Sequence, residues 1–132
     1  MKYLLDTNIC IYIIKRKPPD VFSRFQTCEV GDIGISSITV AELTHGTQKS
    51  QHPEKNQAAL EQFLLPLEIV DFDITAAQVY GNIRSQLEKQ GIPIGPLDFL
   101  IAAQAISLEI RLITNNEKEF LRVPELIVEN WV

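Results

Sequence analysis

The chain has 132 residues, of which 45% are hydrophobic and 22% charged, a composition typical of a folded domain and unlike that of a disordered chain. Its formal net charge of −5 excludes broad, non-specific attraction to nucleic acid, so a polyanion must be bound through a local basic patch or through metal ions. No apolar run reaches the roughly 20 residues of a membrane helix, no export signal is present, and Cys10 and Cys28 lack the spacing of a zinc site. We therefore expect one soluble, cytoplasmic domain over residues 1–132, without membrane contact.

Short apolar runs alternate with helical patterns along the chain. The expected strands cover residues 2–5, 31–35, 67–72, 111–114 and 126–128. The expected helices cover residues 9–15, 18–26, 53–65, 74–90, 95–108 and 117–121, together with one that starts in the cap cluster at 36–39 and ends near residue 49. Because each strand is short and continuously apolar, the pattern predicts the α/β class, with a mostly parallel sheet of four or five strands covered by helices on both faces.

Acidic and amide side chains follow several of these elements at points that a parallel sheet brings together. Asp6 follows the first strand, Glu42 lies near the start of the helix capped at 36–39, and Asp98 falls in the first turn of the helix that Pro96 begins. Three further polar residues follow the strand at 111–114, namely Asn115, Asn116 and Glu119. Since ligands bind in the crevice at the carboxyl ends of parallel strands, we expect these side chains to gather at one edge of the sheet.

Each acid also has an explanation that needs no function. Asp6 could simply cap the following helix, Thr39 and Glu42 match a capping box, and Asp98 could complement the helix dipole. Glu119 alone reads as solvated surface. These separate explanations do not account for several acids at one edge, where two unit charges about 4 Å apart repel by about 4 kcal/mol at an effective dielectric constant of about 20.

A divalent cation would remove this repulsion. A set of ligands that offers only oxygen atoms favours a hard ion, so the sequence predicts Mg²⁺, with Mn²⁺ as a substitute, rather than zinc or copper. Glu42 and His45 form an ExxH pair of the kind found in di-iron bundles, but the chain has no second ExxH, so His45 is expected to be a packed or surface residue.

Four segments in this order resemble the PIN-domain endoribonucleases, and within them the VapC-type toxins of bacterial toxin–antitoxin pairs. They are LLDTN at 4–8, ISSITVAEL at 35–43, GPLDFLIAA at 95–103 and ITNNEKEF at 113–120, with IVENWV at 127–132 closing the chain. The resemblance covers essentially the whole chain and implies a three-layer α/β/α sandwich of the PIN-like type. It also implies that Asp6, Glu42 and Asp98 match the metal-binding acids of the family.

The residue that matches the fourth acidic position of the family is harder to assign. Many members carry an acid where this chain has Asn116, and Glu119, one helical turn later, is the candidate for the missing charge. The resemblance therefore implies a catalytic and metal-binding set of Asp6, Glu42, Asp98 and Glu119, and leaves open whether one or two metal ions bind. The residues expected to orient these carboxylates or to touch phosphate are Thr7, Asn8, Thr114 and Asn116.

The same resemblance implies a magnesium-dependent endoribonuclease toxin that cleaves cellular RNA, often a tRNA, that a cognate antitoxin protein neutralises, and that forms a homodimer. A catalytically inactive PIN-like module that binds RNA or protein is the alternative, and Asn116 in place of an acid supports it. A phosphate-transfer domain is a further alternative, although Asn8 stands where a dehalogenase-type phosphatase requires a second Asp.

Overall fold

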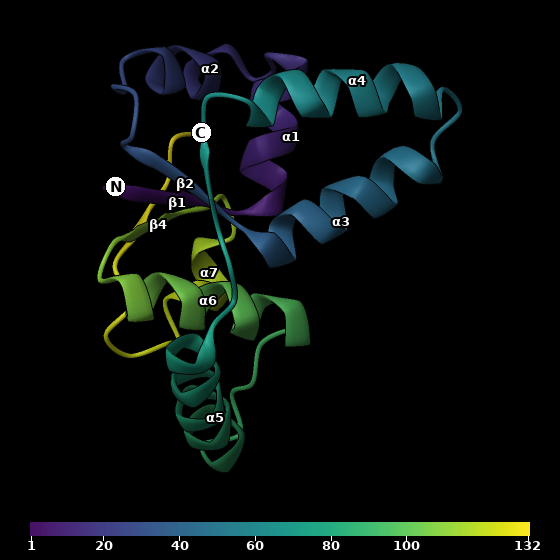
Figure 1. Cartoon of the computed structure of the whole chain (residues 1–132). Helices are drawn as coiled ribbons and strands as arrows, with labels where there is room; N and C mark the ends of the chain where they lie inside the picture. The colour runs from purple at the N-terminus through teal and green to yellow at the C-terminus, as the bar shows by residue number, and fades with distance from the viewer.

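Five short strands form one sheet in the order β3-β2-β1-β4-β5, and every pairing within it is parallel (Figure 1). The computed structural model describes all residues from 1 to 132. The strands are β1 (Tyr3–Leu5), β2 (Ile33–Ser36), β3 (Glu68–Val70), β4 (Arg111–Ile113) and β5 (Val128–Glu129). The prediction of a parallel α/β sheet is confirmed.

Every expected helix is present, and no helix is long and apolar enough to cross a membrane. The helices are α1 (Thr7–Lys15), α2 (Pro19–Gln26), α3 (Ser37–Gln48), α4 (Pro53–Leu64), α5 (Ile74–Lys89), α6 (Pro96–Leu108) and α7 (Glu117–Phe120). Helix α5 ends as predicted, with Gly91 in the left-handed region at a φ of 73°.

The two edge strands differ from their predicted limits. The strand predicted at 67–72 is reduced to Glu68–Val70, and the strand predicted at 126–128 is shifted to Val128–Glu129. An edge strand pairs on one side only, so its length depends on its neighbour. Ser36 is the last residue of β2 to pair with β3, and β5 begins where Val128 meets Leu112.

Each face of the sheet carries its own hydrophobic core. Leu4 and Leu112 point to the face covered by α5 and α6, whereas Leu5 and Ile113 point to the face covered by α1, α2 and α4. This separation follows from the alternation of side chains along a strand. Figure 1 shows the two groups of helices on opposite sides of the strands, which confirms the predicted three-layer sandwich.

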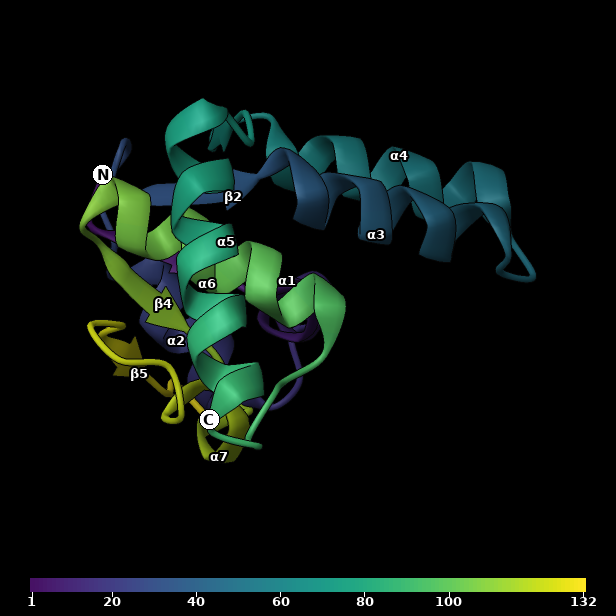
Figure 2. The ribbon, with the colours of Figure 1, turned by 90° about the horizontal axis from the view of Figure 1, so that it is seen from below.

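Helices α3 and α4 run side by side and project from the sheet as an arm (Figure 2). Near the tip, the Thr47 hydroxyl donates a hydrogen bond of 2.7 Å to Oε1 of Gln57, which ties the two helices together. The base of the arm is the β2–α3 junction, so the direction of the arm is set where the sheet ends.

The capping box considered as an alternative explanation for Thr39 and Glu42 does not form. Ser36 caps α3, because its Oγ accepts a hydrogen bond of 3.1 Å from the backbone N–H of Ile38. The helix therefore begins earlier than a cap at Thr39 would require. Thr39 is buried inside α3, and its hydroxyl oxygen has no hydrogen-bond partner.

Candidate active site

Asp6 lies at the carboxyl end of β1, where the chain turns into α1. Its Oδ1 accepts a hydrogen bond of 2.9 Å from the backbone N–H of Ile9, so the predicted capping role is confirmed. Its Oδ2 accepts a hydrogen bond from the hydroxyl of Thr114. The cap thus orients the carboxylate at the strand edge, and each oxygen keeps a further lone pair for another ligand.

The electrostatic surroundings of Asp6 disfavour its charge. Only 7% of the residue is exposed, and burial is the main reason that its pKa is raised. The hydrogen bonds from Thr114 and Ile9 lower the pKa, while the negative charge of Glu42 raises it further. A buried carboxylate of this kind gains most from a nearby positive charge.

Thr114 links three elements at this edge. Its hydroxyl donates to Asp6, which follows β1, and accepts a hydrogen bond of 2.9 Å from the backbone N–H of Asn116 at the start of α7. Thr114 itself directly follows β4 and is fully buried. The orienting role predicted for Thr114 therefore has a geometric basis.

Glu42 projects from α3 toward the start of α1. Its Oε1 accepts a hydrogen bond of 2.8 Å from the hydroxyl of Thr7, the first residue of α1. Its charge contributes to the raised pKa of both Asp6 and Asp98, so it lies within electrostatic reach of both. Asn8 is exposed, and its backbone N–H makes a small contribution that lowers the pKa of Asp6, so the role expected for its side chain stays a prediction.

Asp98 occupies the first turn of α6 and faces the other acids. Burial raises its pKa most, followed by the charge of Glu119, and the value rises from 3.8 to about 6. A hydrogen bond with Glu119 and the charges of Asp6 and Glu42 raise it further. Gly95 lies beneath this carboxylate, because a Cβ at Gly95 would stand 3.3 Å from Oδ2 of Asp98.

Glu119 reaches the site from the short helix α7. The side-chain amide of Asn116 donates a hydrogen bond of 3.1 Å to Oε2 of Glu119, and the negative charge of Glu119 raises the pKa of Asp98. Asn116 therefore positions the carboxylate of Glu119, whose charge reaches Asp98. The structure thus places Glu119, whose membership the sequence left uncertain, in the same group as the other acids.

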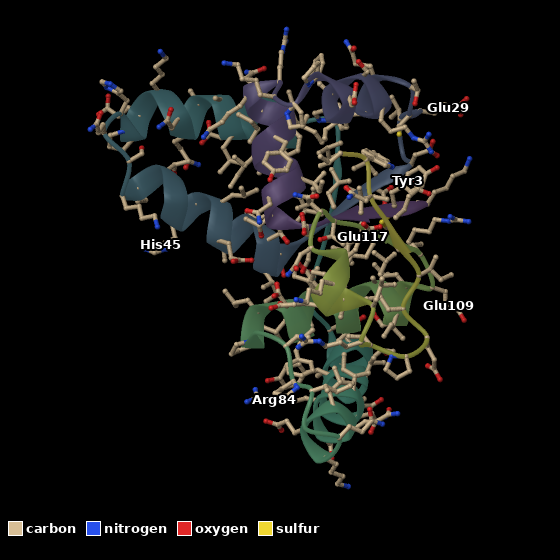
Figure 3. The ribbon with its side chains drawn as sticks, turned by 180° about the vertical axis from the view of Figure 1, so that it is seen from behind. Tyr3, Glu29, His45, Arg84, Glu109 and Glu117 are labelled. Atoms are coloured by element: carbon tan, nitrogen blue, oxygen red, sulfur yellow. The ribbon has the colours of Figure 1, made fainter.

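The four acids form one electrostatic group, but no three of them converge on a point as a complete metal cage. The oxygen-only set fits Mg²⁺ or Mn²⁺, since Mg²⁺ usually binds one or two carboxylates together with waters and substrate phosphate rather than an all-protein cage. The role of these residues as metal ligands stays a prediction. His45 is exposed on the projecting arm (Figure 3), as expected, and takes no part in the group.

One buried residue near the site was missed in the sequence analysis. Gln104 is buried within α6, whose other buried residues are apolar, and the hydroxyl of Ser36 donates a hydrogen bond of 3.0 Å to its Oε1. A single glutamine inside an otherwise apolar helix was the available signal, because a buried amide requires a partner.

Acids gathered at the carboxyl edge of a parallel sheet, between helices on both faces, are the arrangement that the sequence predicted for a PIN-type nuclease. The chain belongs to the PIN domain family, whose model matches residues 3–126. It is 50% identical over 132 residues to "Ribonuclease VapC2" of Haemophilus influenzae, covering 100% of this chain and 99% of that protein. It is also 46% identical over 131 residues to "tRNA(fMet)-specific endonuclease VapC" of Shigella flexneri, covering 99% of this chain and 98% of that protein.

The fold agrees with these matches. A crystal structure of VapBC2 from Rickettsia felis, bound to a DNA fragment from its promoter, contains a chain that is 44% identical and superimposes with a TM-score of 0.93. The superposition covers 100% of both chains. The resemblance to VapC-type proteins is confirmed, and the phosphate-transfer alternative is not favoured.

Proposed function

We propose that this protein is a metal-dependent endoribonuclease toxin that cleaves cellular RNA and is neutralised by a cognate antitoxin. The observation that carries the proposal is the group of four acids at the carboxyl edge of the sheet, in which the charges of Glu119, Asp6 and Glu42 all reach Asp98. The ribonuclease and endonuclease names of the full-length relatives support the same activity.

A structured RNA, and within that class a tRNA, is the proposed substrate. The relative from Shigella flexneri is named for cleavage of a tRNA, and its match covers 99% of this chain. Proteins select such RNAs by shape and by unpaired loop bases. This selectivity suits a chain with a net charge of −5, which lacks a general attraction to polyanions.

The residues of the site would divide the chemistry as follows. Asp6 and Asp98 would supply oxygen ligands to Mg²⁺, with Mn²⁺ as a substitute. The hydroxyl of Thr114 holds Asp6 in place, and the amide of Asn116 holds Glu119. A bound divalent ion supplies activation of water and neutralisation of charge on the phosphoryl oxygens. Glu42, oriented by Thr7, would accept the proton of the attacking water or complete the ligand set.

The alternative of an inactive binding module depended on Asn116. The amide of Asn116 donates to Glu119 at 3.1 Å, so the missing acid is replaced by a neighbouring one. This contact favours the active enzyme over the inactive module.

A groove beside the acids supports the proposed antitoxin. It has a volume of about 310 Å³, lies between α1, α3 and α4, and is bordered by Glu42. Its apolar lining includes Ile11, Ile14, Leu43 and Leu60. An amphipathic helix with a basic residue at its end would bind in the groove and compete with metal near Glu42.

The protein is further proposed to form a homodimer and to act in the cytoplasm, where its RNA substrate is found.

The experiment is incubation of the purified protein with labelled total tRNA, in the presence of Mg²⁺ or of a chelator. Discrete fragments are expected with Mg²⁺ and not with the chelator, and Asp98→Asn should produce none. Binding of RNA without cleavage by the wild-type protein in Mg²⁺ would contradict the proposal and support the inactive module.

A further inference from the structure

Gln104 is a buried polar residue in the middle of α6. Only 1% of it is exposed, and its neighbours Ala102, Ala103 and Ala105 in the same helix are buried and apolar. A buried side-chain amide is retained without penalty only when its hydrogen bonds are made, so its partners indicate what it does.

The side chain of Gln104 connects α6 to two other elements. Its Oε1 accepts a hydrogen bond of 3.0 Å from the hydroxyl of Ser36, and its Nε2 donates a hydrogen bond of 3.4 Å to the backbone carbonyl of Asp71. Ser36 ends β2 and caps α3, while Asp71 follows β3. We call these three groups the Gln104 brace.

The brace joins the two helices that carry acids of the site. Glu42 projects from α3, whose first free N–H groups are fixed by Ser36, and Asp98 projects from the first turn of α6. Glu42 and Asp98 are both acidic and belong to the same group of acids, so their like charges oppose a close approach of the two side chains. This repulsion favours separation of α3 from α6, and the brace opposes that separation from inside the protein, where a hydrogen bond is not weakened by water.

We propose that Gln104 is a positioning residue that, through Ser36, sets the separation of Glu42 and Asp98 and so prepares the site for a divalent ion. The inference rests on the proposed function. Gln104 touches neither substrate nor ligand oxygen in this scheme, and its effect reaches the site through the starts of two helices.

The test compares Gln104→Met with the wild-type protein. Methionine has a similar length and volume but makes neither hydrogen bond of the brace. We expect the kcat for RNA cleavage to fall about tenfold and the dissociation constant for Mn²⁺ alone, measured by titration without RNA, to rise about tenfold, as for other residues that orient metal ligands. The KM for RNA should stay within about twofold, because the brace does not contact the substrate.

A double-mutant cycle identifies the partner. Ser36→Ala should reproduce the loss of Mn²⁺ affinity seen in Gln104→Met, and the double variant should be no weaker than the more affected single variant, because both changes remove the same hydrogen bond. Ser36→Thr keeps the hydroxyl and should restore wild-type affinity.

Two control variants separate positioning from a general loss of stability. Gln57→Met removes an amide that accepts a hydrogen bond of 2.7 Å from Thr47 on the projecting arm, and we expect wild-type kcat and Mn²⁺ affinity. Leu87→Val weakens the core around α5 without touching the brace, so it should lower the melting temperature and leave both values unchanged well below that temperature.

The outcomes are distinguishable. Wild-type kcat and Mn²⁺ affinity in Gln104→Met, or the same loss in Leu87→Val, would overturn the inference while leaving the nuclease intact. If the wild-type protein neither binds Mn²⁺ nor cuts RNA, the proposed function fails. The orientation of α3 relative to α6, measured by residual dipolar couplings, then decides the inference, since it must change in Gln104→Met and not in Gln57→Met.

Discussion

At the scale of single residues, the acids of the site are held in different ways. Asp6 is fixed by hydrogen bonds to both carboxylate oxygens, and Glu42 by one hydrogen bond from Thr7. Asp98 is half-buried in the first turn of α6, and its burial together with the negative charge of Glu119 raises its pKa to about 6. Asp98 is therefore the acid whose ionised form the folded protein most clearly disfavours.

This raised pKa predicts a pH-dependent effect of Asp98→Asn on stability. The folded protein binds a proton at Asp98 more tightly than the unfolded chain does. Protonation of Asp98 therefore stabilises the folded state; this contribution to the free energy of unfolding is fully present below the unfolded pKa of 3.8 and is lost as the pH rises through about 6. Near pH 8 in a chelator, Asp98→Asn should raise the free energy of unfolding by about 1 kcal/mol, a value already reduced for solvent screening of a half-buried group.

Urea denaturation of both proteins at several pH values measures this difference. Most of it should disappear near pH 4, where wild-type Asp98 is protonated in the folded state. Glu54→Gln, which removes one exposed charge from α4, controls for the change in net charge. Equal stability of wild type and Asp98→Asn at high pH would show that Asp98 is not electrostatically strained.

Bound Mg²⁺ should offset the unfavourable ionisation of Asp98, because the cation neutralises the like charges around it. A ligand that binds only the folded protein stabilises it by about 2.7 kcal/mol when its free concentration is about 100 times its dissociation constant. Thermal unfolding near neutral pH should therefore shift upward with Mg²⁺ in the wild-type protein and remain unchanged in Asp98→Asn. An equal shift in both proteins would place the ion elsewhere.

At the scale of elements, one hydroxyl connects β1, β4 and α7. Thr114 donates to Asp6 and accepts from the backbone N–H of Asn116, although Asp6 lies 108 positions earlier in the chain. Helix α7 has only four residues and no side-chain cap on its N-cap residue Asn116, so this contact is part of what fixes its start. The position of Glu119 follows from it.

Thr114→Val tests this connection. Valine keeps the shape but leaves a buried carboxylate oxygen and a backbone N–H without their partner, which should reduce the free energy of unfolding by about 1–3 kcal/mol. RNA cleavage should fall by about 10- to 100-fold, because Asp6 and Glu119 both lose orientation. Thr114→Ser keeps the hydroxyl and should recover most of both properties in urea denaturation and cleavage assays.

At the scale of the whole molecule, the projecting arm creates a groove that adjoins the acids. Gly46 lines this groove on α3, and a Cβ placed there would meet no atom within 4 Å, so a larger side chain enters open space. The groove and the catalytic edge share Glu42, which allows one partner to occupy the first and block the second.

Gly46→Leu should weaken antitoxin binding while the fold and RNA cleavage persist. The leucine would fill space that we assign to the antitoxin helix, and it also improves helix propensity by about 1 kcal/mol. We expect at least a tenfold rise in the antitoxin dissociation constant, about 1.4 kcal/mol, measured by calorimetry. Gly81→Leu on α5 is the matched control, since a Cβ there also meets nothing within 4 Å. Equal antitoxin affinity in both variants would place the antitoxin on another surface.

Local patterns predicted the order of the elements and indicated acids that the fold brings to one edge of the sheet. Pro96, Gly91 and the apolar runs act on the chain within a few residues, so helices and central strands appear close to their expected limits. Asp6 and Asp98 could be identified because they lie at the N-cap of α1 and in the first turn of α6, which a parallel sheet directs to one edge. Glu42 lies in the second turn of α3, so the resemblance to the family was the stronger signal for it. The limits of β3 and β5 could not be predicted, because pairing with a neighbour sets them.

The amino-acid sequence by itself thus determined the class of fold, which depends on short-range periodicity and residue type. It also indicated the family and the candidate acids, through four segments that resemble the PIN-domain endoribonucleases. Only the tertiary structure decided the partners: Thr114 with Asp6, Asn116 with Glu119, and Gln104 with Ser36 across 68 positions. The physical reason is that a buried hydrogen bond between distant residues depends on which strands become neighbours. The strand order β3-β2-β1-β4-β5 arises from packing on both faces of the sheet, so no short segment of the sequence predicts it.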